Sequence, residues 1–369
     1  MFREIEGSDT GRPGKPLKVG VLTFHRCINY GSYWQARSLL EGLRARGHQV
    51  VLLEYECPDI DRTEWRCAMQ PLLPQRSSRE DIRAYAIKAR LFQDAIAALP
   101  VSAPFPLCEP EAMEAFDLVV VGSDEVWNLC HPWFGGYDVF WGQGIPATRV
   151  ISYAASFGSY DADAGIDERW SERLRAFDAV SVRDENSRRL VAAALGREPA
   201  LVLDPVLQFP IAIPETVEPA REPYAAVYGH GFSEAFGAAT RRWADARGIK
   251  LVSIGYRNDF AHEQRIEVDP FEFTRLIAGA QAVVTNFFHG CVFALLNARP
   301  FACAITPYRM NKVRDLMALL GAETHLLRED DPAERFAEVL DTPIAPAILD
   351  EITRLRAQSD DYLELAVTA

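Results

Sequence analysis

A histidine at the end of an apolar segment is the residue of this sequence with the clearest capacity for chemistry. The segment Ala278–Phe301 reads AGAQAVVTNFFHGCVFALLNARPF, and His289 follows its apolar run AVV. Such a run is typical of a strand buried in a parallel sheet, and Val292–Leu296 resumes an apolar pattern at helical spacing. Gly290 allows a close turn between the two elements. The pattern predicts strand, tight turn and helix, with His289 at the carboxyl end of the strand.

The predicted position of His289 is one where open α/β sheets bind ligands. Strand ends and helix amino-termini meet at that edge, and backbone N–H groups point outward from it. Because an imidazole titrates near neutral pH, His289 is a candidate for acid/base chemistry. The alternative is a core histidine that packs beside Phe287 and Phe288 and is satisfied by one backbone carbonyl.

Arg183 is the second candidate for chemistry. It ends the predicted strand AVSVR and precedes a predicted helix, ENSRRLVAAAL. An arginine at a strand end can hold a carboxylate or a phosphate through both prongs of its guanidinium. The alternative is a surface ion pair with Asp184 or Glu185. A basic loop, PYRMNKVRDL, also brings Arg309 and Lys312 close in sequence to the histidine segment.

The other candidate binding residues sit in loops and strand ends of the same kind. The turn Asn29–Ser32 precedes a predicted helix, and Asp124 follows a predicted central strand; helix capping is the alternative role for both. For His230 the alternative is an exposed loop position. The predicted substrate-binding residues are Asn29, Gly31, Ser32, Gln35, Asp124, Asn128, His230, Arg257, Asn286, Gly290, Arg309 and Lys312.

The elements that must position these residues alternate between strand and helix along the chain. Short apolar runs of the buried type are followed by amphipathic helices such as Ser32–Arg46 and Ala235–Arg247. Strands are predicted at Lys18–Thr23, Gln49–Tyr55, Phe116–Gly122, Arg149–Ser152, Ala179–Arg183, Leu201–Asp204, Tyr224–Tyr228, Lys250–Ile254 and Pro300–Ile305. This alternation predicts two α/β, Rossmann-like domains with a cleft between them.

The chain length and one proline-rich segment suggest where the domains divide. At 369 residues the chain is longer than one hydrophobic core usually supports, and PIAIPETVEPAREP carries four prolines without apolar periodicity. We predict a flexible N-terminal segment at 1–17, an N-terminal domain at 18–209, a linker at 210–223, a C-terminal domain at 224–330, and a helical segment at 331–369 that packs back on the domains.

The composition argues against several classes of function. A formal charge of −13 is unsuited to binding nucleic acid or anionic lipid. The first 17 residues contain no apolar core of a signal peptide, and no apolar run approaches the length of a membrane span. We therefore expect a cytoplasmic protein. The seven cysteines lack metal-ligand spacing, and the turn FHRCINYGS lacks GxGxxG and GxxxxGK[ST], so we expect reduced thiols, no metal and no dinucleotide cofactor.

In their order and spacing, the motifs resemble those of the polysaccharide pyruvyl transferase family. They are VGVLTFHRCINYGSYWQ, FDLVVVGSDEVWN, ISYAASFG, AVSVRDENS, LVLDP and VVTNFFHGCVFALL, and they run through nearly the whole folded chain. The resemblance implies a GT-B-like fold and transfer of an enolpyruvyl-derived unit from phosphoenolpyruvate to sugar hydroxyls, usually as a ketal. It also implies that His289, in the family's FHG motif, acts in acid/base chemistry and that Arg183, in SVRD, grips the donor.

The same resemblance sets expectations for ligands and partners. It implies phosphoenolpyruvate as donor substrate, a sugar-containing acceptor, no separate cofactor, no nucleic acid and no integral membrane segment; a homo-oligomer is left open. Members of the family often read TDSFHG where this chain reads TNFFHG, so Asn286 and Phe287 are where its substrate would differ. The alternatives are a nucleotide-sugar-dependent glycosyltransferase of the same fold and a binding relative without catalysis.

Overall fold

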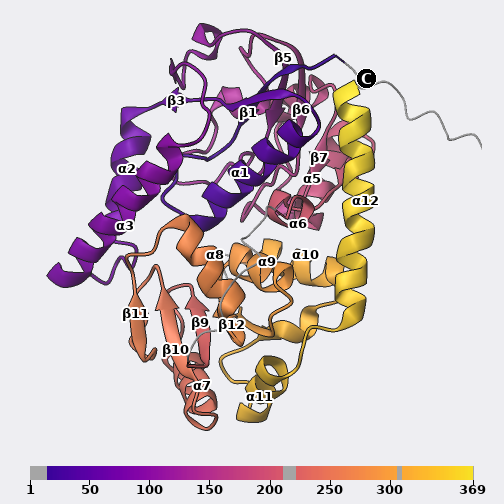
Figure 1. Cartoon of the computed structure of the whole chain (residues 1–369). Coiled ribbons are helices and arrows are strands. Elements are labelled where there is room, and N and C mark those ends of the chain that lie inside the picture. Colours follow the sequence, from indigo (N-terminus) through magenta and orange to yellow (C-terminus); the bar gives the residue numbers. More distant parts are fainter. Residues whose placement is uncertain (1–14, 211–221, 306–309, 369) are drawn as a thin grey trace, which may run out of the picture.

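A computed structural model describes residues 15–210, 222–305 and 310–368 of the chain. Two parallel sheets organise it, one in each half of the sequence (Figure 1). The first has the order β2 (Gln49–Leu52), β1 (Lys18–Leu22), β5 (Phe116–Val121), β6 (Ala147–Ser152). The second has the order β11 (Glu263–Arg265), β10 (Lys250–Ile254), β9 (Tyr224–Tyr228), β12 (Ala282–Thr285), β13 (Phe301–Ala304), β14 (Leu326–Leu327). The predicted α/β fold with two Rossmann-like domains is confirmed.

Helices cover the two sheets, because each helix buries apolar side chains in the core. Those of the N-terminal half are α1 (Tyr30–Ala45), α2 (Pro58–Met69), α3 (Arg79–Ala97), α4 (Glu168–Arg175), α5 (Glu185–Leu195) and α6 (Pro205–Gln208). Those that follow are α7 (Glu234–Asp245), α8 (Pro270–Gly279), α9 (Phe288–Leu296), α10 (Met310–Leu320), α11 (Ala333–Asp341) and α12 (Pro346–Thr368). Within the described residues, no helix combines the length and the apolar character that a bilayer span requires.

Short strands complete the N-terminal half and refine two of the predicted boundaries. The run predicted as one strand at Gln49–Tyr55 is divided between β2 and β3 (Tyr55–Glu56), and β3 pairs with β4 (Phe105–Pro106). Strand β7 (Ser181–Val182) pairs with β8 (Ala200–Leu201). The strand predicted at Leu201–Asp204 is therefore shorter than expected. A proline at the first helical position and an aspartate cap start α6 there instead.

The basic segment predicted as a loop is helical where it is described. Lys312 lies in α10, whose apolar residues Val313, Leu316, Met317 and Leu320 recur at helical spacing and are all buried. Arg309, like most of the predicted linker, lies outside the described residues. Helix α10 therefore fixes the direction of Lys312 more firmly than a loop would.

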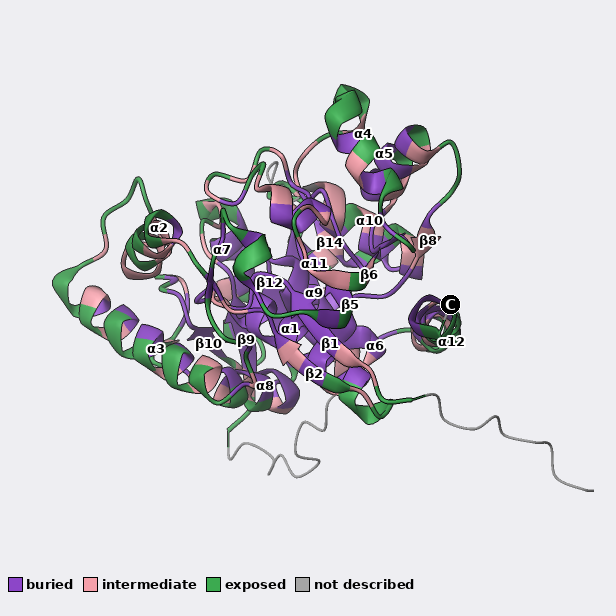
Figure 2. Cartoon of the chain, turned by 90° about the horizontal axis from the view of Figure 1, so that it is seen from above, coloured by how far each residue is buried: buried purple, intermediate pink, exposed green. Residues whose placement is uncertain are grey.

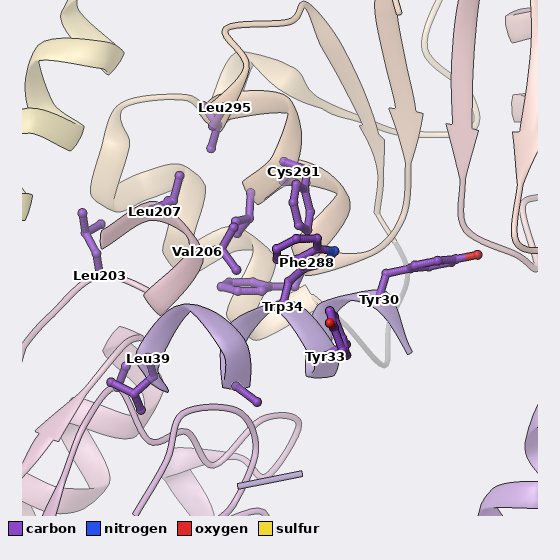
Figure 3. Packing of buried hydrophobic residues seen from close by; sticks show 14 of the residues in the cluster. Tyr30, Tyr33, Trp34, Leu39, Leu203, Val206, Leu207, Phe288, Cys291 and Leu295 are labelled. Carbon is purple, nitrogen blue, oxygen red and sulfur yellow. The ribbon is translucent and has the colours of Figure 1, made fainter. Parts of the chain in front are cut away.

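Helix α1 joins the two sheets, because its aromatic side chains reach into the C-terminal half. The hydroxyl of Tyr30 donates a hydrogen bond to the carbonyl of Val268 at 2.8 Å, and its ring stacks on Phe273 at 4.2 Å. The indole N–H of Trp34 donates to the carbonyl of Pro270 at 2.9 Å. Figure 3 shows side chains of α1, α6 and α9 packed together, and one apolar cluster contains all of them.

Buried residues lie in the interior of the molecule and exposed residues on the outer faces of surface helices such as α3 (Figure 2). One of the apolar clusters contains residues of both halves. The last helix, α12, adds a further link (Figure 1). The backbone N–H of Leu203 donates to the hydroxyl of Ser359 at 2.9 Å, and the hydroxyl of Tyr362 donates to the carbonyl of Ser152 at 2.7 Å. Because a large apolar interface opposes independent motion, the two halves hold a fixed relation to each other.

A buried lysine crosses the same interface. The amine of Lys88, on α3, donates a hydrogen bond to the carbonyl of Gly255 at 2.9 Å and lies 4.0 Å from the centre of the Tyr256 ring. Only 3% of Lys88 is exposed. Burial lowers the pKa of Lys88 from its ordinary value of 10.5 to about 7, against an opposing effect of Glu64.

The lowered pKa of Lys88 predicts a pH dependence of stability. Between pH 7 and 10.5 the unfolded chain holds a proton on this amine that the folded chain has released, so stability rises with pH across that window. We expect the melting temperature of the wild type to rise with pH relative to that of Lys88→Met. The exposed Lys250→Met serves as the control, and parallel curves for wild type and Lys88→Met would contradict the prediction.

Candidate active site

A cavity of about 230 Å³ lies between the two halves of the molecule. The N-terminal half contributes Phe24, Cys27, Asn29, Ser32, Glu64, Asp124, Glu125, His131 and Trp133. The C-terminal half contributes Tyr228, His230, Tyr256, Phe287, Phe288, His289 and Lys312. Several of these residues follow the carboxyl ends of parallel strands, which is where ligands bind in open α/β folds.

His289 lies in the first turn of α9, which begins earlier than the sequence predicted. The N–H of Phe287 donates to the hydroxyl oxygen of Thr285 at 3.0 Å, and this hydroxyl donates to the carbonyl of Tyr228 at 2.6 Å. These bonds end the strand, and two bend residues, Asn286 and Phe287, form the tight turn into the helix. Gly290 is therefore required by close packing rather than by a turn, because a Cβ there would lie 1.9 Å from Oγ1 of Thr285.

Groups from the N-terminal half hold the ring of His289. A Cβ on Gly31 would lie 2.1 Å from Nδ1 of the histidine, so α1 packs directly on the imidazole. On the other side, Nε2 lies 3.4 Å from Oδ2 of Asp204, close enough for an ion pair. This nitrogen is buried and has no aligned hydrogen bond to any described residue. His289 is 8% exposed, so it is packed as a core residue and still lines the cavity.

Arg183 lies behind the cavity wall, and its guanidinium is already paired. It donates to Oδ2 of Asp204 at 2.8 Å and to Oδ1 of Asp124 at 3.1 Å, and it lies 4.6 Å from the centre of the Phe288 ring. Its side chain is fully buried, which rules out the alternative of a surface ion pair. Both prongs hold carboxylates of the chain itself, and a direct grip on a donor stays a prediction.

The two carboxylates beside Arg183 stay ionised at neutral pH. Burial works to raise the pKa of Asp204, but His289 and Arg183 outweigh it and lower that pKa to about 2. Burial likewise opposes the ionisation of Asp124, and Arg183, His289 and Lys312 together hold its pKa below the ordinary value. The inner side of the histidine therefore faces fixed negative charge.

The amino-terminus of α1 forms the adjoining wall. The side-chain oxygen of Asn29 accepts hydrogen bonds from the N–H groups of Gly31 at 2.8 Å and Ser32 at 3.2 Å. The capping alternative is thus correct for Asn29, which also lines the cavity. The hydroxyl of Ser32 donates to Oδ2 of Asp124 at 2.9 Å. Because α1 and α9 both present their amino-termini here, their dipoles favour an anionic ligand.

Lys312 supplies a cation from the C-terminal half. Its amine pairs with Oε1 of Glu125, whose other oxygen accepts a hydrogen bond from the amide of Asn128 at 2.8 Å. Burial works to raise the pKa of Glu125, but Lys312 reverses the effect and holds it below the ordinary value. Asn128 thus supports the pair from outside the lining of the cavity.

Of the remaining predicted residues, some hold the residues that line the cavity, and one lies away from it. Gln35 is buried and donates to the hydroxyl of Thr23 at 2.9 Å. Asn286 donates to the carbonyl of His230 at 2.8 Å, so it positions a cavity residue. Arg257 lies away from this cavity, where it pairs with Asp81 of α3 at 3.1 Å and lines a second cavity, so its role in binding stays a prediction.

Sequence reasoning missed several residues of the site. Asp204 lies in the motif LVLDP, and Glu125 follows Asp124 in the motif FDLVVVGSDEVWN. Each is a carboxylate after a predicted strand, and this position could have identified both as site residues. Glu64 and His131 lie in stretches without a recognisable pattern, and only the tertiary structure brings them to the cavity. Among the described residues, no group of three or more histidine, cysteine, aspartate or glutamate side chains is arranged to hold a metal ion.

Solved structures share this fold at low sequence identity. A Listeria monocytogenes protein assigned as a UDP-N-acetylglucosamine 2-epimerase matches with a TM-score of 0.53 and 11% identity, over 95% of each chain. MnaA of S. aureus with UDP matches with a TM-score of 0.51 and 12% identity, over 94% of this chain and 91% of that one. The UDP-GlcNAc 2-epimerase of Methanocaldococcus jannaschii matches with a TM-score of 0.50 and 11% identity, over 88% and 91%. A search of curated proteins found no match.

The fold is a GT-B-like scaffold of two Rossmann-like domains with a cavity between its halves. The model of one family, polysaccharide pyruvyl transferase, matches residues 29–306, which is most of the chain and includes most of the residues that line the cavity. The chain belongs to the polysaccharide pyruvyl transferase family. Its class is therefore that of a sugar-modifying transferase.

Proposed function

We propose that this protein transfers a pyruvyl group from phosphoenolpyruvate to hydroxyls of a sugar, a glycan precursor or a glycosylated metabolite, forming a ketal and releasing phosphate. The observation that carries the proposal is the position of His289, the histidine of the family's FHG motif. It lines a cavity between the domains and is backed by the ionised Asp204. A positioned imidazole of this kind is suited to general acid/base catalysis.

The reaction requires two additions at one carbon. A proton is added to the methylene carbon of phosphoenolpyruvate, and an acceptor hydroxyl adds to the neighbouring carbon and loses its proton. A second hydroxyl then adds to the same carbon while the phosphate leaves, and its proton balances the phosphate. The site must therefore hold a multiply charged anion and move two protons in each direction.

The lining of the cavity supports binding of such an anion. Lys312 can turn from Glu125 to the donor, and the amino-termini of α1 and α9 add positive potential. We propose that Arg309, outside the described residues, assists Lys312, and that the reaction uses no metal or separate cofactor. Tyr256 and Phe287 also line the cavity, and aromatic side chains of this kind are suited to contact a sugar.

Thermal-shift measurements separate this proposal from its main alternative, a nucleotide-sugar-dependent glycosyltransferase. We expect phosphoenolpyruvate to raise the melting temperature and UDP to leave it unchanged. One of the structures with this fold contains UDP, so UDP is the appropriate competing ligand. Stabilisation by UDP with none by phosphoenolpyruvate would favour the glycosyltransferase, and stabilisation without turnover of any donor would favour a binding relative.

Replacing Gly31 tests whether the position of the imidazole matters. In Gly31→Ala the new Cβ would lie 2.1 Å from Nδ1 of His289, so the ring must move. A displacement of about 1 Å can cost about 10²-fold in rate, and we expect a loss of that order in phosphate release. The ring is buried, so its displacement should also cost some stability, and the rates are compared at a temperature at which the variant is folded.

A second glycine of α1 provides the matched control. In Gly42→Ala the Cβ would lie 2.5 Å from the Phe209 ring, which is part of the apolar core and does not line the cavity. We expect this variant to lose stability and to retain the catalytic rate. Equal rates for Gly31→Ala and the wild type would show that the packing of α1 on His289 is not needed for turnover.

A further inference from the structure

Three carboxylates line the described part of the cavity, and Glu64 differs from the other two. Asp124 is paired with Arg183, and Glu125 is paired with Lys312. Glu64, on α2, makes no salt bridge within the part of the chain that the structure describes; one of its oxygens, Oε1, accepts a hydrogen bond from the N–H of Ile28 at 2.9 Å. The side chains of Cys27 and Trp133 are its further hydrogen-bond partners, and both are neutral groups. A carboxyl group held by neutral donors at the edge of a cavity can exchange a proton there.

The surroundings of Glu64 favour its protonated form. Burial raises the pKa of Glu64, and this outweighs the opposing hydrogen bonds and the charge of Lys88. Besides Lys88 of α3, the titratable groups that interact with it are Cys27 in the loop before α1, Tyr55 of β3 and Cys67 of its own helix. The three are neutral at neutral pH. An anionic donor in the cavity would raise this pKa further, since like charges oppose ionisation.

The proposed reaction needs more proton transfers than one histidine provides at one moment. The methylene carbon must gain a proton while the acceptor hydroxyl loses one, and the two events occur on different atoms of the same complex. His289 comes from the C-terminal half and Glu64 from the N-terminal half, and both line the same cavity. A site with two such groups can carry out the addition in a single complex.

We propose, on the basis of the proposed function, that Glu64 is a second proton-transfer group of this site. It gives its proton to the methylene carbon of phosphoenolpyruvate, while His289 takes the proton of the first hydroxyl. In the second addition, the carboxylate of Glu64 takes the proton of the second hydroxyl, and His289 returns its proton to the departing phosphate. Each hydroxyl proton is accounted for, and both residues end the cycle in their starting form.

Glu64→Gln tests the proposal with little change of structure, because the amide oxygen still accepts from Ile28. We expect phosphate release from phosphoenolpyruvate to fall about 10²–10⁴-fold with a smaller change in KM. The wild-type rate should decline as pH rises and Glu64 loses its proton, and this limb of the pH profile should be absent in the variant. Glu56→Gln, an exposed glutamate on β3, is the matched control. Wild-type rate and pH profile in a folded Glu64→Gln would overturn the proposal.

Infrared difference spectroscopy keeps the test independent of the proposed reaction. The band of a protonated carboxyl group, taken as wild type minus Glu64→Gln, reports the titration of Glu64 without substrate, and Glu64→Asp serves as a second reference if the glutamine variant is unstable. A band that persists above the ordinary range of glutamate supports the proposal; its disappearance within that range overturns it, even in an active enzyme. A persistent band together with no phosphate release by the wild type would count against the proposed function instead.

Discussion

We expect His289→Ala to lose phosphate release from phosphoenolpyruvate by about 10²–10⁴-fold, the usual contribution of a positioned acid/base group. The side chain lies between Gly31 and Asp204 and faces the cavity, so its removal leaves the proton of the acceptor hydroxyl without a partner. The loss should appear in kcat more than in KM, because the imidazole acts on the transition state. Steady-state rates at saturating donor measure it.

Two controls show whether a loss of rate in His289→Ala comes from the missing imidazole rather than from unfolding. Far-ultraviolet circular dichroism should show an intact fold in His289→Ala, since the ring makes no aligned hydrogen bond at its buried nitrogen to the described residues. His48→Ala, at the end of the turn after α1 and away from the cavity, should keep the wild-type rate. A folded His289→Ala that also keeps the wild-type rate would remove this residue from the mechanism.

Arg183→Met should destabilise the protein by about 3–5 kcal/mol, because it leaves buried carboxylates without their cation. Asp124 and Asp204 are 8% and 2% exposed, and both are paired with the guanidinium. Methionine has a similar length but no charge, so the loss reports the ion pairs rather than the packing. Urea denaturation at neutral pH, where both carboxylates are ionised, provides the measurement.

The control for Arg183→Met is the same substitution at a surface arginine that also pairs with an aspartate. Arg241 on α7 pairs with Asp245 one helical turn away, and Arg241→Met should change stability by less than about 1 kcal/mol. Arg183→Lys should lie between the two, since it keeps the charge but not the two-pronged geometry. If Arg183→Met unfolds at the same urea concentration as the wild type, the buried network is not the support that we describe.

Much of the fold could be predicted from the sequence, because the local signals and the tertiary structure agree. The strands Tyr224–Tyr228 and Lys250–Ile254 are mainly apolar runs, and a glycine follows each of them. They form β9 and β10 with the predicted bounds. The sequence also placed His289, Ser32 and Asp124 after strands whose carboxyl ends meet. Parallel strand order alone brings such residues together.

The roles of the predicted residues were harder to predict, because they depend on partners distant in the chain. Arg183 was expected to hold a ligand, but it holds Asp124 and Asp204, at sequence separations of 59 and 21 residues. Arg257 pairs with Asp81 across the domain interface. No local pattern distinguishes an arginine that binds a substrate from one that binds a carboxylate of its own chain.

The aromatic residues near the start of α1 illustrate the same difficulty. Tyr33 and Trp34 belong to the motif VGVLTFHRCINYGSYWQ, and the sequence alone does not show whether their rings face a ligand or the core. Both are buried against the C-terminal half, and Trp34 donates to the carbonyl of Pro270. By contrast, Phe287 lines the cavity while Asn286 supports it from behind. Of Asn286 and Phe287, the two positions where this chain departs from TDSFHG, Phe287 is therefore the one that lines the cavity.

The most direct test of the proposed function is mass spectrometry of sugar acceptors after incubation with phosphoenolpyruvate and the wild-type protein, with phosphate measured in the same samples. We expect an acceptor to gain the mass of one pyruvyl ketal for each phosphate released, and His289→Ala to show neither product. Transfer of a sugar from a nucleotide donor, with no pyruvyl product and no phosphate from phosphoenolpyruvate for any acceptor, would contradict the proposed function.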